Sequence, residues 1–213
     1  MTGAGSAMQR VFVTRERHAL GADQIDALTE LAARVRELTE AVVLTDVEPA
    51  EVAEVTEEVA KLTARLSAAR RVAPPIAQLD GQGLVRQLAS PVSGRLNPIA
   101  PPVEMKAQPD GSVRCEFTLS AVYEGPPGFV HGGVSALILD QLLGSAAAVN
   151  GTPGMTATLD LRYRRPTPYG VPLTAEARTV RVDGRKTYAD AFIAGPDGKP
   201  TVEATAMFIM PLR

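Results

Sequence analysis

The chain has 213 residues, 45% of them hydrophobic, which is enough to bury the core of one ordinary domain with an extension and is small for two full catalytic domains. A formal net charge of -2 at pH 7 gives no general attraction to nucleic acid or to an anionic membrane, so an anionic ligand has to meet a local basic patch. These values favour a small-molecule partner and argue against a nucleic-acid-binding protein.

The sequence also lacks the signals of several other classes of protein. Cys115 is the single cysteine and forms no disulfide within the chain, and no spaced set of cysteine and histidine residues predicts a metal site. The N-terminus has no long apolar region with a cleavage signal, and no run approaches the roughly 20 apolar residues that span a bilayer. No glycine-rich nucleotide-binding loop occurs. We therefore expect a cytoplasmic protein with no metal, no cofactor and no membrane span.

The N-terminal half divides into three segments. Residues 1–21 show no sustained periodicity and are predicted to be a partly ordered leader. Residues 22–70 contain two runs of apolar side chains spaced by three and four residues, which predict two amphipathic helices joined by a short connection as an antiparallel helical hairpin. Residues 71–102 are rich in Pro, Gly and Ser and predict an extended connection over the next domain. The two apolar runs are Ile25, Leu28, Leu31, Val35, Leu38 and Val42, and then Val52, Val55, Val59, Leu62 and Leu66.

Residues 103–213 change from a helical period to the period of two that is typical of strands. Strands are predicted near 103–108, at 113–121, about 155–164, 173–182, 186–194 and 201–210, with Asp-Gly turns between the last three. One long helix, from Gly132 to about Val149, interrupts them and is apolar nearly all the way round, which predicts a buried helix. The pattern indicates an α+β domain in which a curved antiparallel sheet wraps around one central helix.

Asp140 is the only charged residue between Gly132 and Asn150. A carboxylate on a buried helix is costly, and such a group is more often functional than accidental. The alternative is that Asp140 meets an arginine or solvent at the edge of the helix. We favour the functional interpretation.

His131, Gly132 and Gly133 begin the same helix. Two glycines remove side-chain bulk, so a ligand oxygen can approach free backbone N–H groups at the positive end of the helix dipole, as in an oxyanion hole. The alternatives are a plain capping turn and, for His131, a neutral core or cap histidine rather than an orienting residue.

The spacing between His131 and Asp140 adds a constraint on assembly. At about 1.5 Å per residue, nine residues of helix separate them by roughly 13 Å, so one chain cannot bring them together. Two such helices running antiparallel across a two-fold axis would place each Asp140 at the other subunit's His131. We therefore expect a homodimer with two shared sites, with a dimer of dimers as a further arrangement.

The run Glu124-Gly-Pro-Pro-Gly-Phe-Val-His131-Gly-Gly, followed by Asp140 and by Leu-Arg-Tyr-Arg-Arg-Pro-Thr-Pro at 161–168, resembles the PaaI-type hotdog thioesterases over about residues 97–210. The resemblance implies a hotdog fold and hydrolysis of an acyl-CoA to a free acid and CoA, within lipid metabolism. It implies that Asp140 is general base or nucleophile, that the Gly132 N–H, beside Gly133, polarises the thioester carbonyl, and that Thr156 assists. Phe129 and Val130 are expected to contact the substrate.

Two parts of the resemblance leave alternatives open. Some members of the family carry an Asn about six residues before the His, where this chain has Gly125, so that helper is either absent or replaced by Glu124. The phosphates of coenzyme A need cations, and Arg165 and Arg185 are the candidates that we favour among the basic residues at strand ends and turns. The competing interpretation is that these arginines are solvated surface charges.

A second function from a different class is a non-catalytic acyl-CoA binding or sensor protein that keeps the hotdog dimer and uses the helical hairpin as an output module. The first helix of the hairpin mixes acidic and basic residues and lacks the basic face of a DNA-binding helix. The hairpin would otherwise cover apolar surface, lengthen the dimer contact or close over an acyl tunnel. A hotdog hydratase would require a paired Asp and His, which His131 before two glycines fits poorly.

Overall fold

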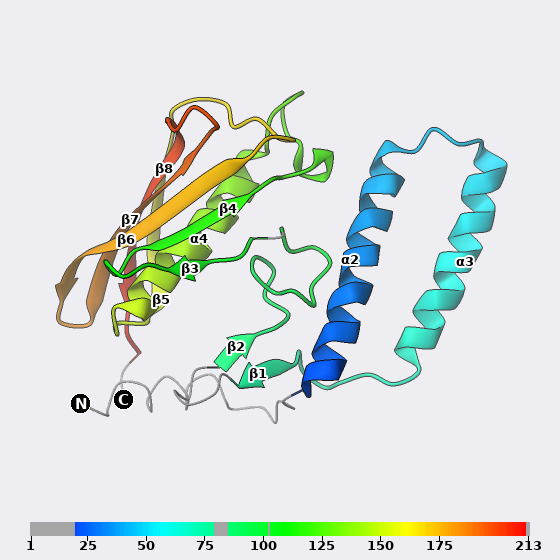
Figure 1. The fold of residues 1–213 in the computed structure, drawn as a ribbon, viewed down its shortest axis with the longest axis horizontal. Coiled ribbons are helices and arrows are strands. Elements are labelled where there is room, and N and C mark those ends of the chain that lie inside the picture. The colour runs from blue at the N-terminus through cyan, green and yellow to red at the C-terminus, as the bar shows by residue number, and fades with distance from the viewer. Residues whose placement is uncertain (1–19, 79–84, 102, 212–213) are drawn as a thin grey trace.

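The computed structural model describes residues 20–78, 85–101 and 103–211, and the predicted leader lies almost wholly outside them. Residues 103–211 form a six-stranded antiparallel sheet in the order β3-β4-β6-β7-β8-β5, with one long helix, α4, against it (Figure 1). This is the arrangement that the alternating strands and the apolar helix predict. The strands are β3 (Lys106–Ala107), β4 (Val113–Phe117), β5 (Met155–Tyr163), β6 (Leu173–Asp183), β7 (Lys186–Ala194) and β8 (Pro200–Ile209), and the helices are η1 (Ala121–Tyr123) and α4 (Gly132–Val149).

The core lies between the sheet and the buried face of α4. The helix contributes its large side chains, while the facing positions of the middle strands are mostly alanines, so the helix axis can approach the sheet closely. Cys115 on β4 belongs to this core, and its burial raises the pKa of the thiol to about 12. The buried helix residues are Ser135, Ile138, Leu139, Leu142, Leu143, Ala146 and Ala147, and the facing alanines are Ala175, Ala177, Ala189, Ala191, Ala204 and Ala206.

The prediction that α4 is buried all the way round is wrong for the single chain. Leu137 is 40% exposed, and Asp140 and Gln141 are only half-buried. These residues lie on the side of the helix that the sheet leaves open. By length and composition α4 is also the one helix among the described residues that could cross a membrane. Its contacts with five strands are those of a core helix, so this criterion is weak evidence for a span.

Strand β5 forms one edge of the sheet, since among the described residues it pairs with β8 alone. It is nine residues long, and nearly all of its side chains are exposed on both faces. A long edge strand of this kind presents unpaired backbone N–H and C=O groups that can pair with another chain. The opposite edge, β3, has only two residues, so the strand predicted at 103–108 is much shorter than expected.

The segment before the sheet differs in part from its prediction. Two short strands, β1 (Ile76–Gln78) and β2 (Val85–Gln87), pair antiparallel within the stretch that was expected to be extended. The chain then follows turns and bends through residues 88–101. Sequence periodicity does not reveal a pair of three-residue strands, because each is too short to show an alternation.

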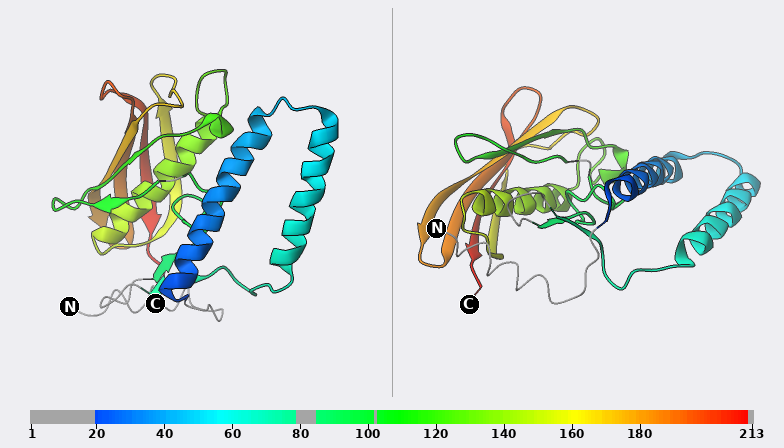
Figure 2. Two further views of the ribbon diagram at one scale, coloured as in Figure 1. Left: turned by 45° about the vertical axis from the view of Figure 1, so that its right-hand side comes forward. Right: turned by 60° about the horizontal axis from the view of Figure 1, so that its bottom comes forward.

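The two predicted helices are present as α2 (Ala22–Leu44) and α3 (Pro49–Ser67), and they run in opposite directions (Figure 1). They are splayed apart rather than packed together, as the three views agree (Figure 2). Helix α2 lies beside η1, and its Arg36 Nη1 donates a hydrogen bond to the Asn97 carbonyl at 3.3 Å. Only α2 covers surface of the sheet domain, because α3 has no buried residue.

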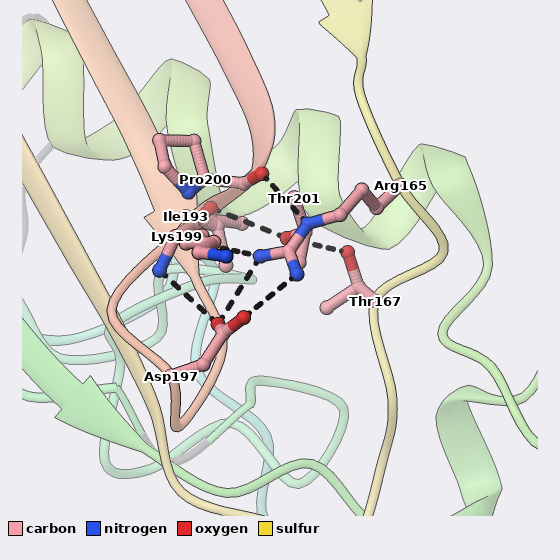
Figure 3. A network of polar contacts seen from close by, with 7 residues as sticks. All are labelled: Arg165, Thr167, Ile193, Asp197, Lys199, Pro200 and Thr201. Carbon is pink, nitrogen blue, oxygen red and sulfur yellow. Dashed lines mark hydrogen bonds and ion pairs between the residues drawn. The ribbon is translucent and has the colours of Figure 1, made fainter.

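A polar network ties the turn between β7 and β8 to the segment after β5 (Figure 3). The Arg165 guanidinium donates to both carboxylate oxygens of Asp197, at 2.8 and 3.2 Å, and to the carbonyls of Lys199 and Pro200. Close by, the buried Thr167 hydroxyl donates to the Thr201 hydroxyl at 2.8 Å. The network fixes residues 165–167, which lie beside the loop that leads into α4.

Replacing Asp197 with asparagine should remove one acid-labile contribution to stability. The hydrogen bond from Arg165 lowers the pKa of Asp197 from 3.8 to about 2. Because the folded pKa lies below the unfolded one, this contribution is complete above about pH 4 and is lost as the pH falls through about 2. Urea unfolding across this range should show the difference between the wild type and Asp197→Asn shrinking as the pH falls. Asp46→Asn, in the loop between α2 and α3, is the control. Parallel losses in wild type and Asp197→Asn would contradict the assignment.

Candidate functional site

The loop that leads into α4 turns back on itself tightly, and two glycines make this conformation accessible. A Cβ atom on Gly125 would lie 2.7 Å from the Cα of His131, a backbone atom that cannot move aside. Gly128 has a φ of +84°, in the left-handed region that glycine adopts without strain. The Gly125 N–H donates to the Phe129 carbonyl at 2.9 Å. These glycines bring His131 to the start of the helix.

Glu124 supports the same loop. Its Oε1 accepts a hydrogen bond from the Gly128 N–H at 2.7 Å, so the carboxylate is engaged within the loop. At the position where some members of the family have an asparagine, Gly125 offers no side chain at all. The sequence left open whether this asparagine is absent or replaced by Glu124. In the structure the Glu124 carboxylate holds the loop.

The two residues expected to contact substrate point in different directions. Phe129 is 37% exposed, whereas Val130 is buried in the core cluster. The Val130 N–H donates to the Thr167 carbonyl at 2.8 Å, which joins this loop to the segment that Arg165 and Asp197 hold. Phe129 is therefore available to a ligand at the surface, and Val130 anchors the loop.

His131 is the N-cap of α4, and its imidazole uses one of the free N–H groups of the helix. Nδ1 accepts a hydrogen bond from the Gly133 N–H at 3.0 Å. Nδ1 is thus the ring nitrogen that accepts, and the cap occupies it. The structure thus shows the capping role that was one of the two interpretations of His131. A Cβ on Gly133 would approach this ring to 3.1 Å, so glycine leaves the cap room.

The Gly132 N–H has no acceptor in the described part of the chain, and as the first helical residue it has no partner within the helix. The capping turn therefore leaves one N–H of the first turn available, because the Gly133 N–H is capped by His131 and the Gly132 N–H is not. The carbonyl of Gly132 accepts from the Tyr163 hydroxyl at 3.0 Å. Sequence reasoning missed Tyr163, whose role depends on β5 lying beside the first turn of α4.

Asp140 lies in the middle of α4, and the structure places Thr156 against it. The Thr156 hydroxyl, at the start of β5, donates to Asp140 Oδ1 at 2.9 Å. Asp140 is half-buried, on the open side of the helix, and its second carboxylate oxygen makes no hydrogen bond to the described residues. A carboxylate held by one hydroxyl and open on its other oxygen can accept a proton or attack an electrophile.

The two halves of the site stay apart within one chain. Gly132 and Asp140 belong to the same uninterrupted helix, so they are separated by about eight residues of rise, roughly 12 Å. Strand β5 contacts both halves, through Thr156 near its start and Tyr163 at its end. Both halves of the site therefore lie beside β5, at the edge of the sheet.

The two arginines favoured for phosphate binding are both engaged with the protein. Arg165 is held by Asp197 and two carbonyls, and Arg185 donates to the Met210 carbonyl through Nε and Nη2, at 2.9 and 2.7 Å. A phosphate on Arg165 would have to replace Asp197. Arg164 is likewise paired, with Glu203 at 2.7 Å. These contacts give each arginine a structural role, and its binding to a phosphate stays a prediction.

A cavity of about 340 Å³ opens between α2 and residues 87–104, with Thr29, Arg36, Arg95 and Glu104 among its lining residues. It includes neither His131 nor Asp140. Within the described residues, no group of three His, Cys, Asp or Glu side chains could hold a metal ion.

Comparison with known proteins gives the family of this arrangement. The family model described as the thioesterase superfamily matches residues 127–200, which include Gly132, Asp140 and Thr156. Acyl-coenzyme A thioesterase THEM4 of Xenopus laevis is 35% identical over 96 residues, and that of Mus musculus is 38% identical over 87. These alignments cover 45% and 40% of this chain and 43% and 37% of those proteins, so the chain matches less than half the length of these relatives.

A solved structure matches over nearly the whole chain. It is a crystal structure described as that of a thioesterase superfamily protein, 39% identical in sequence, with a TM-score of 0.78. The alignment covers 91% of this chain and 98% of that one, and therefore includes the helices before the sheet. Together with the central helix in its curved sheet, this match confirms the predicted hotdog fold, and the chain belongs to the thioesterase superfamily.

Proposed function

We propose that the protein is an acyl-CoA thioesterase, which hydrolyses the thioester of an acyl-CoA to a carboxylic acid and free coenzyme A. The observation that carries the proposal is that α4 holds an available N–H at Gly132 and an open carboxylate at Asp140. The Gly132 carbonyl and the Asp140 carboxylate each accept a hydrogen bond from β5. The curated relatives named acyl-coenzyme A thioesterases support the choice of substrate.

The chemistry assigns a different task to each end of the site. The thioester oxygen accepts a hydrogen bond from the Gly132 N–H, and the positive end of the helix dipole stabilises the charge that develops on it. Asp140 acts on the carbonyl carbon from the other side. It either takes a proton from a water that attacks, or attacks itself to form a mixed anhydride that water then hydrolyses. In both routes the C–S bond breaks and the thiolate leaves. Water supplies its proton, through Asp140 in the first route and when the anhydride is hydrolysed in the second, and the water oxygen ends in the carboxylic acid.

The proposed site is completed by a second copy of the chain. Two copies related by a two-fold axis would pair their β5 edges and run their α4 helices antiparallel, which brings the Gly132 of one copy to the Asp140 of the other. The open side of α4 and β5 carries apolar side chains in keeping with such a contact. Leu137 is 40% exposed and Met155 61% exposed in the single chain.

The first test removes the carboxylate. Asp140→Asn should lower kcat by about 10²- to 10⁴-fold, because asparagine can neither accept the proton of water nor attack the carbonyl. Affinity for a non-hydrolysable acyl-CoA thioether should change little. Asp190→Asn is the matched control, since this carboxylate lies on the opposite face of the sheet from α4. Undiminished hydrolysis in Asp140→Asn would refute the proposal.

The second test removes the N–H of residue 132. Gly132→Pro should lower kcat by about 10²- to 10³-fold, because proline has no N–H to donate to the oxyanion. The backbone tolerates the change, since proline suits the first position of a helix and His131 before it is extended, with φ -60° and ψ 132°. Gly132→Ala adds the same Cβ near the Tyr163 ring but keeps the N–H, so it should retain most activity. Equal losses in the two variants would contradict the oxyanion role.

The third test asks whether the site is shared. Subunits carrying Asp140→Asn and subunits carrying Gly132→Pro should each be inactive alone and should recover activity when mixed. Random reassortment makes about half of the dimers mixed, each with one intact site of two, so about one quarter of wild-type activity is expected. Turnover measured after partial denaturation and refolding of the mixture is the readout. No recovery in dimers shown by mass spectrometry to be mixed would mean that each chain carries a complete site.

A further inference from the structure

Helix α3 carries an apolar stripe that the described part of the chain leaves uncovered. The stripe repeats at alternating three- and four-residue steps, which is the seven-residue pattern of a coiled-coil seam. None of the helix is buried, and Leu62 and Leu66 are 50% and 59% exposed. The stripe, called the α3 seam below, consists of Val52, Val55, Val59, Leu62 and Leu66.

The neighbouring helix does not cover the seam. Helices α2 and α3 are splayed apart in every view, and α2 instead lies beside η1 (Figures 1 and 2). A helix of 19 residues with no buried residue is marginal in water, since most helical stability in proteins comes from packing of the apolar face. No described residue covers the seam, so its occupant has to come from outside the described part of the chain.

The charges on α3 indicate what that occupant is. The first half of the helix carries Glu51, Glu54, Glu57 and Glu58, whereas the second half carries Lys61 and Arg65. Two copies in parallel would bring acidic halves together. Two copies in antiparallel orientation place the acidic half of each beside the basic half of the other and also oppose the helix dipoles favourably. We propose that α3 pairs antiparallel with α3 of a second copy of this chain.

The flanks of the seam also fix the register. Glu58 and Arg65 each directly precede a seam residue. When two helices pair antiparallel, side chains at this position of one helix face side chains at the same position of the other. The register that sets Glu58 against Arg65 of the partner subunit packs Val59 on Leu62 of the partner subunit and covers Leu66. Shifting by one repeat would set Glu58 against Glu58 of the partner subunit and leave Leu66 exposed. The opposite flank holds Thr56 and Thr63, which add no charge.

This surface is distinct from the β5 edge. If the β5 edges also pair, each dimer presents two α3 helices. Pairing of these helices with those of another dimer forms a dimer of dimers, in which each of the two contacts raises the effective concentration for the other contact. The proposal does not rest on thioester hydrolysis, because its readout is the mass of the assembly.

The test is a charge exchange on the full-length chain. Glu58→Arg places like charges opposite each other at both ends of the pair, and Arg65→Glu does the same with the opposite sign. Each single variant should shift the association midpoint, measured by analytical ultracentrifugation across a dilution series, to at least tenfold higher concentration. The double variant carrying both changes exchanges the two charges and should return the midpoint to near that of the wild type.

The controls separate pairing from folding. Glu57→Arg makes the same charge change on the side of α3 away from the seam and should leave the midpoint unchanged. The circular dichroism spectra and hydrolysis rates of the single variants should match those of the wild type when the proteins are compared at concentrations that give the same degree of assembly. Single variants that assemble like the wild type, or a double variant that stays as weak as the singles, would overturn the antiparallel α3 pair.

Discussion

The rigidity of α4 is the constraint on which the rest of the arrangement depends. One continuous helix carries both the unengaged N–H of Gly132 and the carboxylate of Asp140, and its rise keeps them roughly 12 Å apart. The helix cannot bend to join them, because its leucines are packed against small side chains on the sheet. Any chemistry that uses both groups on one thioester must therefore take one of them from another copy.

Strand β5 lies next to both groups. It holds the carboxylate through Thr156 and the first helical turn through Tyr163, and its far edge pairs with no described strand. The loop before the helix is fixed from a different direction. Val130 is joined to Thr167, and the nearby guanidinium of Arg165 fastens that segment to the turn between β7 and β8. In the proposed dimer, each chain would therefore bring its half of the site already assembled, so pairing need not order these groups.

Much of the fold could be read from the sequence, because local periodicity reports which side of an element is buried. The helix from Gly132 and the strand at 186–194 are found within the predicted bounds, since both have long and regular patterns. Periodicity does not report what does the burying. For that reason the pattern predicted a buried α4 and an antiparallel helical hairpin, but it did not indicate that α4 and α3 each leave apolar surface uncovered in the single chain.

The candidate site was predictable to a similar limit. Asp140 stands out in the sequence because it is the only charge in an apolar run. The glycines stand out because they remove side-chain bulk at the start of the helix. The place of Thr156 followed from the family resemblance, and Tyr163 was missed because only the alignment of β5 with the helix gives its hydroxyl a partner. Arg165 could not be assigned, since an arginine at a strand end looks the same in sequence whether it awaits a phosphate or already binds an aspartate such as Asp197.

The burial of Cys115 bears on the proposed reaction in a different way. The proposed hydrolysis of an acyl-CoA releases a thiol next to the protein, and thiolates exchange readily with thioesters and disulfides. With its pKa raised to about 12 and its sulfur in the core, the only cysteine of the chain stays a protonated thiol. In the proposed reaction it can therefore neither take the acyl group from the substrate nor form a mixed disulfide with released coenzyme A.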